Sequence, residues 1–177
     1  MKVFEDTAMR CLKGLMYHRQ LEDYFRFLGF DDLARIQRER YLEESDGFAR
    51  VCTCYLQETG KLLKFDDPKV ESLIPPSWYQ HVKNDVDTST RKSHLKQAMD
   101  FWVNWEREVL EAHDASALQM DRDGLRLMSL FFCRMLNDVR DELAFAERLR
   151  EELQITEYDP ADALSISAKY ASHLKEA

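Results

Sequence analysis

Glycine and proline are scarce in this sequence, with only five glycines and four prolines among 177 residues. These two residues occupy many of the turns that a protein with numerous strands requires. Apolar residues make up 45% of the chain, which is a normal share for a protein with a buried core. The composition therefore argues against a many-stranded β fold and favours long helices.

Long apolar runs are also missing. No stretch reaches the 18 consecutive apolar residues that are typical of a membrane-spanning helix. The first residues, "MKVFEDTAMRCLKG", carry acidic side chains at Glu5 and Asp6 and contain no apolar run of the length found in signal peptides. We therefore expect a cytoplasmic protein that does not associate with a membrane.

Positive charge is in deficit, since 25 lysines and arginines face 33 aspartates and glutamates, for a net charge of −8. Binding to nucleic acid requires a basic face that displaces counterions from phosphates, so we expect no nucleic-acid partner. An acidic protein is better suited to bind cations. The four cysteines show neither disulfide-framework nor zinc-ribbon spacing, and we expect them to be reduced: Cys11, Cys52, Cys54 and Cys133.

Apolar residues recur at helical spacing in five stretches of the chain. The length suits a single domain that spans residues 1–177. Gly29 and Gly60 are placed to cap the ends of the first two helices, and Pro160 suits the first turn of the last one. The predicted helices are 3–28, 32–59, 91–113, 124–153 and 160–175.

The lengths of the connections predict the topology. The first two helices are joined by a short turn, as are the third and fourth, so each pair should be antiparallel. Residues 60–90, which hold three of the four prolines, form a long crossover. A helix of about 28 residues is about 42 Å long, and only this crossover could run back along it. The second and third helices should therefore be parallel.

Each of the four long helices places acidic residues on its predicted core face. An ionised carboxylate in a core is costly unless it meets a cation or a hydrogen-bond donor. Two explanations stay open: a bound cation such as iron or manganese, which suits carboxylates and imidazole, or a salt-bridge network in which Arg40 pairs with Glu22 or Glu43. The polar residues on these faces are His18, Glu22, Arg40, Glu43 or Glu44, Glu106, Asp138 and Glu142.

Several short motifs resemble the ferritin and bacterioferritin family. They are the turn "FLGF", the "EE" of "YLEESDGFARV", the helix end "CYLQETGKL", the stretch "WEREVLEAH" and a short C-terminal helix. The resemblance extends over most of the chain. It implies an all-α, ferritin-like four-helix bundle with a long crossover between the second and third helices and a short fifth helix. It also implies a homo-oligomer, either a dimer or a larger cage.

The di-iron centre of that family takes a glutamate from the first helix, Glu-x-x-His from the second, a glutamate from the third, and either Glu-x-x-His or a Gln-type position from the fourth. Glu44 matches the glutamate of the second helix and Glu106 that of the third. Gly47 stands where the first histidine would be, and Phe145 follows Glu142 where another would be. The chain contains no intact Glu-x-x-His.

The resemblance implies an iron-binding protein with metal ions as its partners, and with Fe(II) oxidation and iron storage at an atypical, carboxylate-rich site. Ferroxidase activity stays open because the motif is incomplete. The alternative is a non-catalytic helical subunit, or an interaction module, whose buried charges pair among themselves. The metal ligands expected from the core faces and the resemblance are Glu44, Glu106, Glu142, Asp138, Glu22 and His18.

Overall fold

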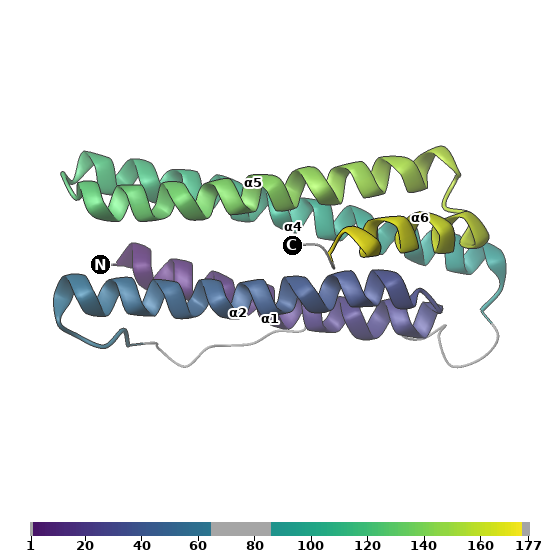
Figure 1. The fold of residues 1–177 in the computed structure, drawn as a ribbon, viewed down its shortest axis with the longest axis horizontal. Helices are drawn as coiled ribbons and strands as arrows, with labels where there is room; N and C mark the ends of the chain where they lie inside the picture. Colours follow the sequence, from purple (N-terminus) through teal and green to yellow (C-terminus); the bar gives the residue numbers. More distant parts are fainter. Residues whose placement is uncertain (1, 65–85, 175–177) are drawn as a thin grey trace.

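The computed structural model describes residues 2–64 and 86–174, and every regular element in these ranges is an α-helix. The expected all-α class is therefore confirmed. None of the helices in the described ranges has an apolar stretch long enough to cross a membrane. The helices are α1 (Lys2–Leu28), α2 (Asp31–Thr59), α4 (Thr88–Arg122), α5 (Arg126–Ile155) and α6 (Pro160–His173) (Figure 1).

A glycine turn joins α1 to α2. Gly29 has a φ of 83°, and the N–H of Phe30 donates to the carbonyl of Phe25 over 2.8 Å. This bond pattern closes the end of a helix around a left-handed residue, which glycine adopts without strain. Asp31 and Asp32 then place negative charge in the first turn of α2, where the helix dipole favours it. The tight turn forces α1 and α2 into an antiparallel hairpin.

The second hairpin, α4 with α5, is built in the same way. The side chain of Asp87 accepts a hydrogen bond of 2.8 Å from the N–H of Thr90 and so caps the start of α4. Gly124 has a φ of 71°, and the N–H of Leu125 donates to the carbonyl of Met120 over 2.9 Å. A glycine turn therefore also sets the antiparallel direction of α5.

The end of α4 corrects the prediction from the sequence, which ended this helix at His113. The helix continues through the polar stretch as far as Arg122. Ala117 and Met120 keep the helical spacing within that stretch, and both are buried. Two apolar side chains one turn apart are thus enough to hold a polar segment on the core as helix.

The two hairpins lie against each other so that α2 and α4 run in the same direction, as the connection lengths predict (Figure 1). Most of the predicted crossover at 60–90 lies outside the described residues, since 65–85 are not among them. The short helix α6 begins at Pro160, where Asp159 accepts from the N–H of Ala161 over 3.0 Å. It packs against α2 and α5 near one end of the bundle.

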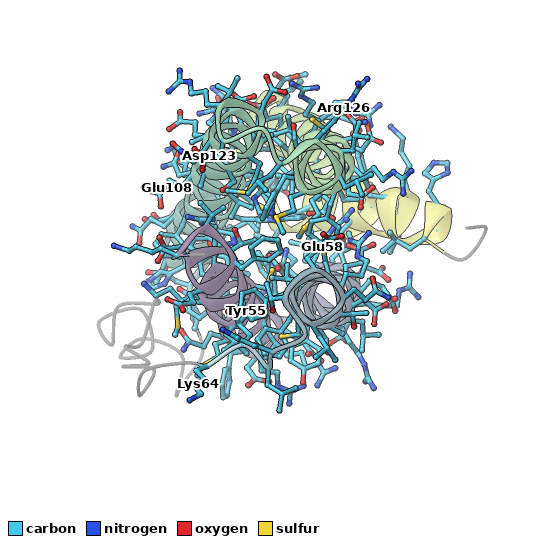
Figure 2. All side chains as sticks on the ribbon, turned by 90° about the vertical axis from the view of Figure 1, so that its left-hand side faces the viewer. Tyr55, Glu58, Lys64, Glu108, Asp123 and Arg126 are labelled. Atoms are coloured by element: carbon cyan, nitrogen blue, oxygen red, sulfur yellow. The ribbon has the colours of Figure 1, made fainter. Side chains whose placement is uncertain are left out.

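Figure 2 looks along the bundle and shows side chains filling the space between the helices. The side chains between the four long helices form two separate apolar clusters. One lies around Trp102 and Phe25, at the end of the bundle that α6 covers, and the other lies around Phe4 and Phe132, at the opposite end. Along every long helix, the residues between the two clusters include polar side chains. The bundle is therefore divided by a polar region at mid-length.

Candidate functional site

The polar region at the middle of the bundle, here called the central polar layer, draws on all four long helices. Its side chains lie where the two apolar clusters end, and all of them except the exposed Glu43 are buried or partly buried. The layer comprises His18 of α1, Gln37, Arg40, Glu43 and Glu44 of α2, Glu106 of α4 and Glu142 of α5.

His18 and Glu106 face each other within the layer, and both are buried. The Nδ1 of His18 donates to Oε1 of Gln37 over 2.8 Å, which leaves Nε2 as the free lone pair, 3.6 Å from Oε1 of Glu106. Burial lowers the pKa of His18 to about 4, so the ring is neutral near pH 7. Two electron-rich atoms therefore point at each other, a geometry that a proton or a cation would stabilise.

Glu106 is held in place by α4 itself. Its Oε1 accepts a hydrogen bond of 2.8 Å from Nε1 of Trp102, one turn away. Its Oε2 is buried and has no hydrogen-bond partner among the described residues. A buried oxygen without a partner costs about 1–3 kcal/mol. Glu106 thus keeps one oxygen free at the centre of the bundle.

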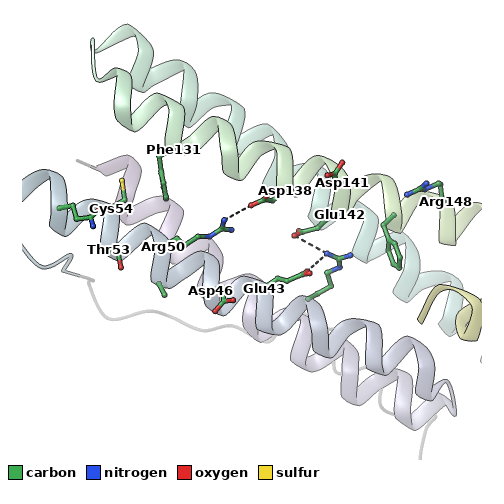
Figure 3. A pocket seen from close by; sticks show the side chains of 14 residues that line it. Glu43, Asp46, Arg50, Thr53, Cys54, Phe131, Asp138, Asp141, Glu142 and Arg148 are labelled. Atoms are coloured by element: carbon green, nitrogen blue, oxygen red, sulfur yellow. Dashed lines mark hydrogen bonds and ion pairs between the residues drawn. The ribbon is translucent and has the colours of Figure 1, made fainter. Parts of the chain in front are cut away.

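Arg40 supplies the positive charge of the layer. Its Nη1 lies 2.5 Å from Oε2 of Glu43 and 3.5 Å from Oε1 of Glu142, and its guanidinium lies over the ring of Phe145, 5.2 Å from the centroid (Figure 3). The arginine side chain is only 9% exposed. Of the two pairings considered from the sequence, Arg40 makes the one with Glu43. It also reaches across to the other hairpin.

Glu44 turns its carboxylate inward because α1 has a glycine opposite it. A Cβ atom added to Gly14 would lie 2.3 Å from Oε1 of Glu44, well inside contact distance. Cys11 of α1 lines a small cavity together with Glu44. The residue as a whole is only partly covered, while its carboxylate is enclosed between the helices. Gly14 is therefore a requirement of the layer rather than of a turn.

The three inward carboxyl groups share one electrostatic environment. Burial, opposed by Trp102 and Arg40, raises the pKa of Glu106 to about 7. Burial and the charge of Glu106 raise the pKa of Glu142 to about 8. Burial, followed by the charges of Glu106 and Glu142, raises the pKa of Glu44 well above its usual range. One guanidinium does not compensate these groups together with Glu43, so the layer holds protons near neutral pH.

Of the six side chains predicted as ligands, four lie in the central polar layer: His18, Glu44, Glu106 and Glu142. The carboxylate of Glu22 is buried, but it lies between two arginines of its own helix, 2.9 Å from Nη1 of Arg19 and 2.6 Å from Nη2 of Arg26. It is thereby compensated outside the layer.

Asp138 is the other predicted ligand that stands apart. It is half exposed at the rim of the layer, where it forms a 3.0 Å ion pair with Arg50 of α2 (Figure 3). Helical spacing placed both Glu22 and Asp138 on inward faces. It could not indicate which arginine each of them would meet.

A groove between α2 and α5 leads from solvent to the central polar layer (Figure 3). It has a volume of about 1050 Å³ and includes Arg40, Glu43 and Glu142 of the layer in its wall. The Arg50–Asp138 pair and the ring of Phe131 also line it. Small ions can therefore reach the layer from this side of the bundle.

Residues without an assigned role in the sequence also gather beside the layer. A cavity of about 30 Å³ is lined by Cys11 of α1, Glu44 and Gly47 of α2, His113 of α4 and Met135 of α5, among others. Gly47, which stands where the ferritin histidine would be, lies beside the Cys11 sulfur; an added Cβ would be 3.6 Å from it. Helical periodicity alone did not connect Cys11 and His113 with Glu44.

The donors of the layer have the right chemistry for a hard cation, since carboxylates with an occasional imidazole suit iron and manganese. Their positions do not yet form a coordination sphere. Within residues 2–64 and 86–174, no three His, Cys, Asp or Glu side chains lie close enough to hold one metal ion as they stand. Arg40 instead approaches the carboxylates from the groove.

Comparison with protein-family models and with curated proteins finds no match to this chain. The functional argument therefore depends on the fold and on the geometry of the layer.

The raised carboxyl pKa values predict that stability falls as pH rises. Below the ordinary value of about 4.5, Glu106 and Glu142 are protonated in both the folded and the unfolded chain. Between that value and about 7 or 8, the folded chain binds more protons, so the free energy of unfolding decreases with pH. Glu142→Gln should flatten this decrease by several degrees of Tm between pH 5.5 and 8.5, because one pKa unit corresponds to about 1.4 kcal/mol.

The measurement is the Tm of metal-free protein across this pH range, with Glu147→Gln, at the surface ion pair with Arg107, as the matched control. The control should keep the slope of the parent protein. Equal slopes in the parent and Glu142→Gln would contradict the assignment of the raised pKa to the layer.

The contact between Gly14 and Glu44 predicts that the effect of Gly14→Ala depends on residue 44. In a Glu44→Ala background, the alanine meets no carboxylate and should stabilise the helix by about 0.5–1 kcal/mol. In the parent, its Cβ displaces the carboxylate, so the gain should be reduced or reversed. Denaturant unfolding of the four proteins of this double-mutant cycle measures the coupling. No coupling would show that Glu44 does not point at Gly14.

Proposed function

We propose that this protein is a ferritin-like iron-binding protein that takes up Fe(II) in its central polar layer. The observation that carries the proposal is the meeting of three inward carboxyl groups, from three helices, with a single buried arginine to compensate them. The parallel α2 and α4, the short fifth helix and the motif resemblance support the ferritin-like assignment.

The free oxygen of Glu106 is the natural centre of such a site. Glu44 and Glu142 contribute to the same electrostatic environment from neighbouring helices, and neutral His18 directs Nε2 toward Glu106. Since no three of the described donors yet surround one point, uptake requires rotation of the glutamate side chains and withdrawal of Arg40. Cation uptake would also displace the protons that the layer holds.

We extend the proposal to oxidation of the bound iron and to its storage. Anionic oxygen ligands favour Fe(III), the harder ion, over Fe(II). Carboxylates that hold two iron ions close together would let O₂ accept electrons from both. Storage requires an enclosed volume, so this part of the proposal includes a homo-oligomer.

The second candidate is a non-catalytic helical subunit or interaction module. The ion pairs of Arg40 favour it, because the guanidinium already links Glu43 to Glu142 across the two hairpins. In this case the layer would serve to fix the pairing of the hairpins, and the remaining carboxyl groups would stay protonated.

Iron addition separates the two candidates. Fe(II) added without oxygen should bind, and exposure to air should then produce the near-ultraviolet absorbance of oxidised iron. The double variant Glu44→Gln, Glu106→Gln should lose this signal because two inward oxygen ligands are gone, whereas Asp138→Asn should retain it. Elemental analysis and native mass of the purified protein complete the test. A parent protein without an iron-dependent signal would refute the iron proposal.

Arg40 gives an independent test. If a cation replaces the guanidinium, Arg40→Met should lower the Tm of the metal-free protein, because removal of a buried partner leaves its carboxylates uncompensated. Addition of Mn(II), which does not oxidise in air at neutral pH on this timescale, should then raise Tm more than in the parent, by linkage. Arg50→Met, at the exposed pair, is the matched control. A variant that Mn(II) does not stabilise would favour the non-catalytic candidate.

A further inference from the structure

The small cavity beside the central polar layer contains a histidine that the proposed iron site does not use. Its volume of about 30 Å³ is sufficient for one water molecule or one ion. His113 lines it from α4, while Cys11 and Glu44 line it from α1 and α2. Residues with donor atoms from three helices therefore line one small cavity, together with Asp138 and Arg50.

The orientation of His113 is the decisive observation. The residue is 2% exposed, and its Nδ1 donates to the carbonyl of Val109 over 2.9 Å. The proton of the neutral ring is therefore on Nδ1, and Nε2 carries a lone pair on the edge of the ring that faces away from the α4 backbone. Nε2 is buried without a hydrogen-bond partner among the described residues. Histidines that bind metals in proteins are commonly held in this way, with the other nitrogen bonded to a backbone carbonyl.

The surroundings of His113 favour a neutral ring. Burial lowers the pKa of His113, and the nearby guanidinium groups of Arg10 and Arg50 lower it further, against the bond to Val109. A neutral ring can accept a hydrogen bond or bind a metal ion but cannot pair with Glu44 as a cation. The free lone pair of Nε2 is therefore available near pH 7.

The second and third donors differ in character from those of the iron layer. Cys11 is buried and lines the cavity together with Glu44. Burial, followed by the charge of Glu44, raises the pKa of the Cys11 thiol, so the thiol keeps its proton until a metal ion binds. Imidazole, thiolate and carboxylate together suit a borderline ion of the zinc type, which binds all three. One water molecule would satisfy Nε2 but would give no role to the sulfur.

We propose that this cavity binds a single borderline transition-metal ion of the zinc type, through Nε2 of His113, the carboxylate of Glu44 and the sulfur of Cys11. Binding releases the thiol proton of Cys11, and any proton on Glu44, to solvent. Small rotations of the Cys11 and Glu44 side chains complete the set, since the described positions do not yet enclose an ion. The inference goes beyond the proposed iron function and shares only Glu44 with it.

Co(II) is the probe, because a bond from thiolate to Co(II) gives a near-ultraviolet charge-transfer band. The full-length, metal-free protein should bind Co(II) with this band. His113→Ala should weaken binding at least tenfold, and Cys11→Ser should remove the band. Glu147→Gln, at the surface ion pair with Arg107, is the control and should leave both unchanged.

The outcomes distinguish this site from the iron layer. Co(II) binding that is unchanged in His113→Ala and absent in Glu106→Gln would overturn the present inference and leave the iron proposal standing. A parent protein that shows the Co(II) band but does not oxidise iron would refute the iron proposal and leave the present inference standing. Nuclear magnetic resonance of the imidazole nitrogens in the parent protein keeps the test decisive if a variant does not fold.

In the metal-free protein, the spectrum should show the proton of His113 on Nδ1 and an unprotonated Nε2. Saturating Zn(II) should shift the Nε2 resonance. An Nε2 resonance that does not change with Zn(II) would show that the cavity holds water only, and would overturn the inference.

Discussion

Desolvation of carboxyl groups is the constraint on which the centre of this molecule depends. A glutamate placed between two apolar clusters has to keep its proton, meet a guanidinium or meet a metal ion. The raised pKa values of Glu106 and Glu142 show that these carboxyl groups keep their protons, and Arg40 supplies the guanidinium. Gly14 follows from the same constraint, since Glu44 needs its empty space to turn inward. Binding of a metal ion by these carboxyl groups is the function that we propose.

The layer lowers the free energy of unfolding that a bundle of this size could reach. The apolar clusters on either side would support the fold, and replacing buried charge by apolar side chains is often neutral or stabilising in other proteins. Glu106 in the layer has an oxygen, and His113 in the adjoining cavity a nitrogen, without a hydrogen-bond partner among the described residues, which suggests a function other than stability. Active and binding sites are where such local conflicts are expected.

The elements that the sequence predicted well depend on local chemistry. Gly29 closes α1, and Pro160 opens α6, because each conformational preference acts within a few residues. The missed extension of α4 depends on Ala117 and Met120 meeting the other helices. Glu22 and Asp138 lie outside the layer for a related reason: periodicity identifies a face, whereas their arginine partners depend on three-dimensional register. The role of Gly14 cannot be inferred from the sequence, because it depends on Glu44 of α2 lying opposite.

The placement of α6 makes solvent access to the bundle interior asymmetric. This helix covers the α2–α5 side near one end, while the groove beside the layer stays open (Figure 1, Figure 3). The exposed Arg50–Asp138 pair stands across that opening, and such pairs contribute about 1 kcal/mol or less. Thermal motion can therefore separate this ion pair without unfolding a helix. Exchange between the interior and solvent through this groove would then be limited by side-chain rotation.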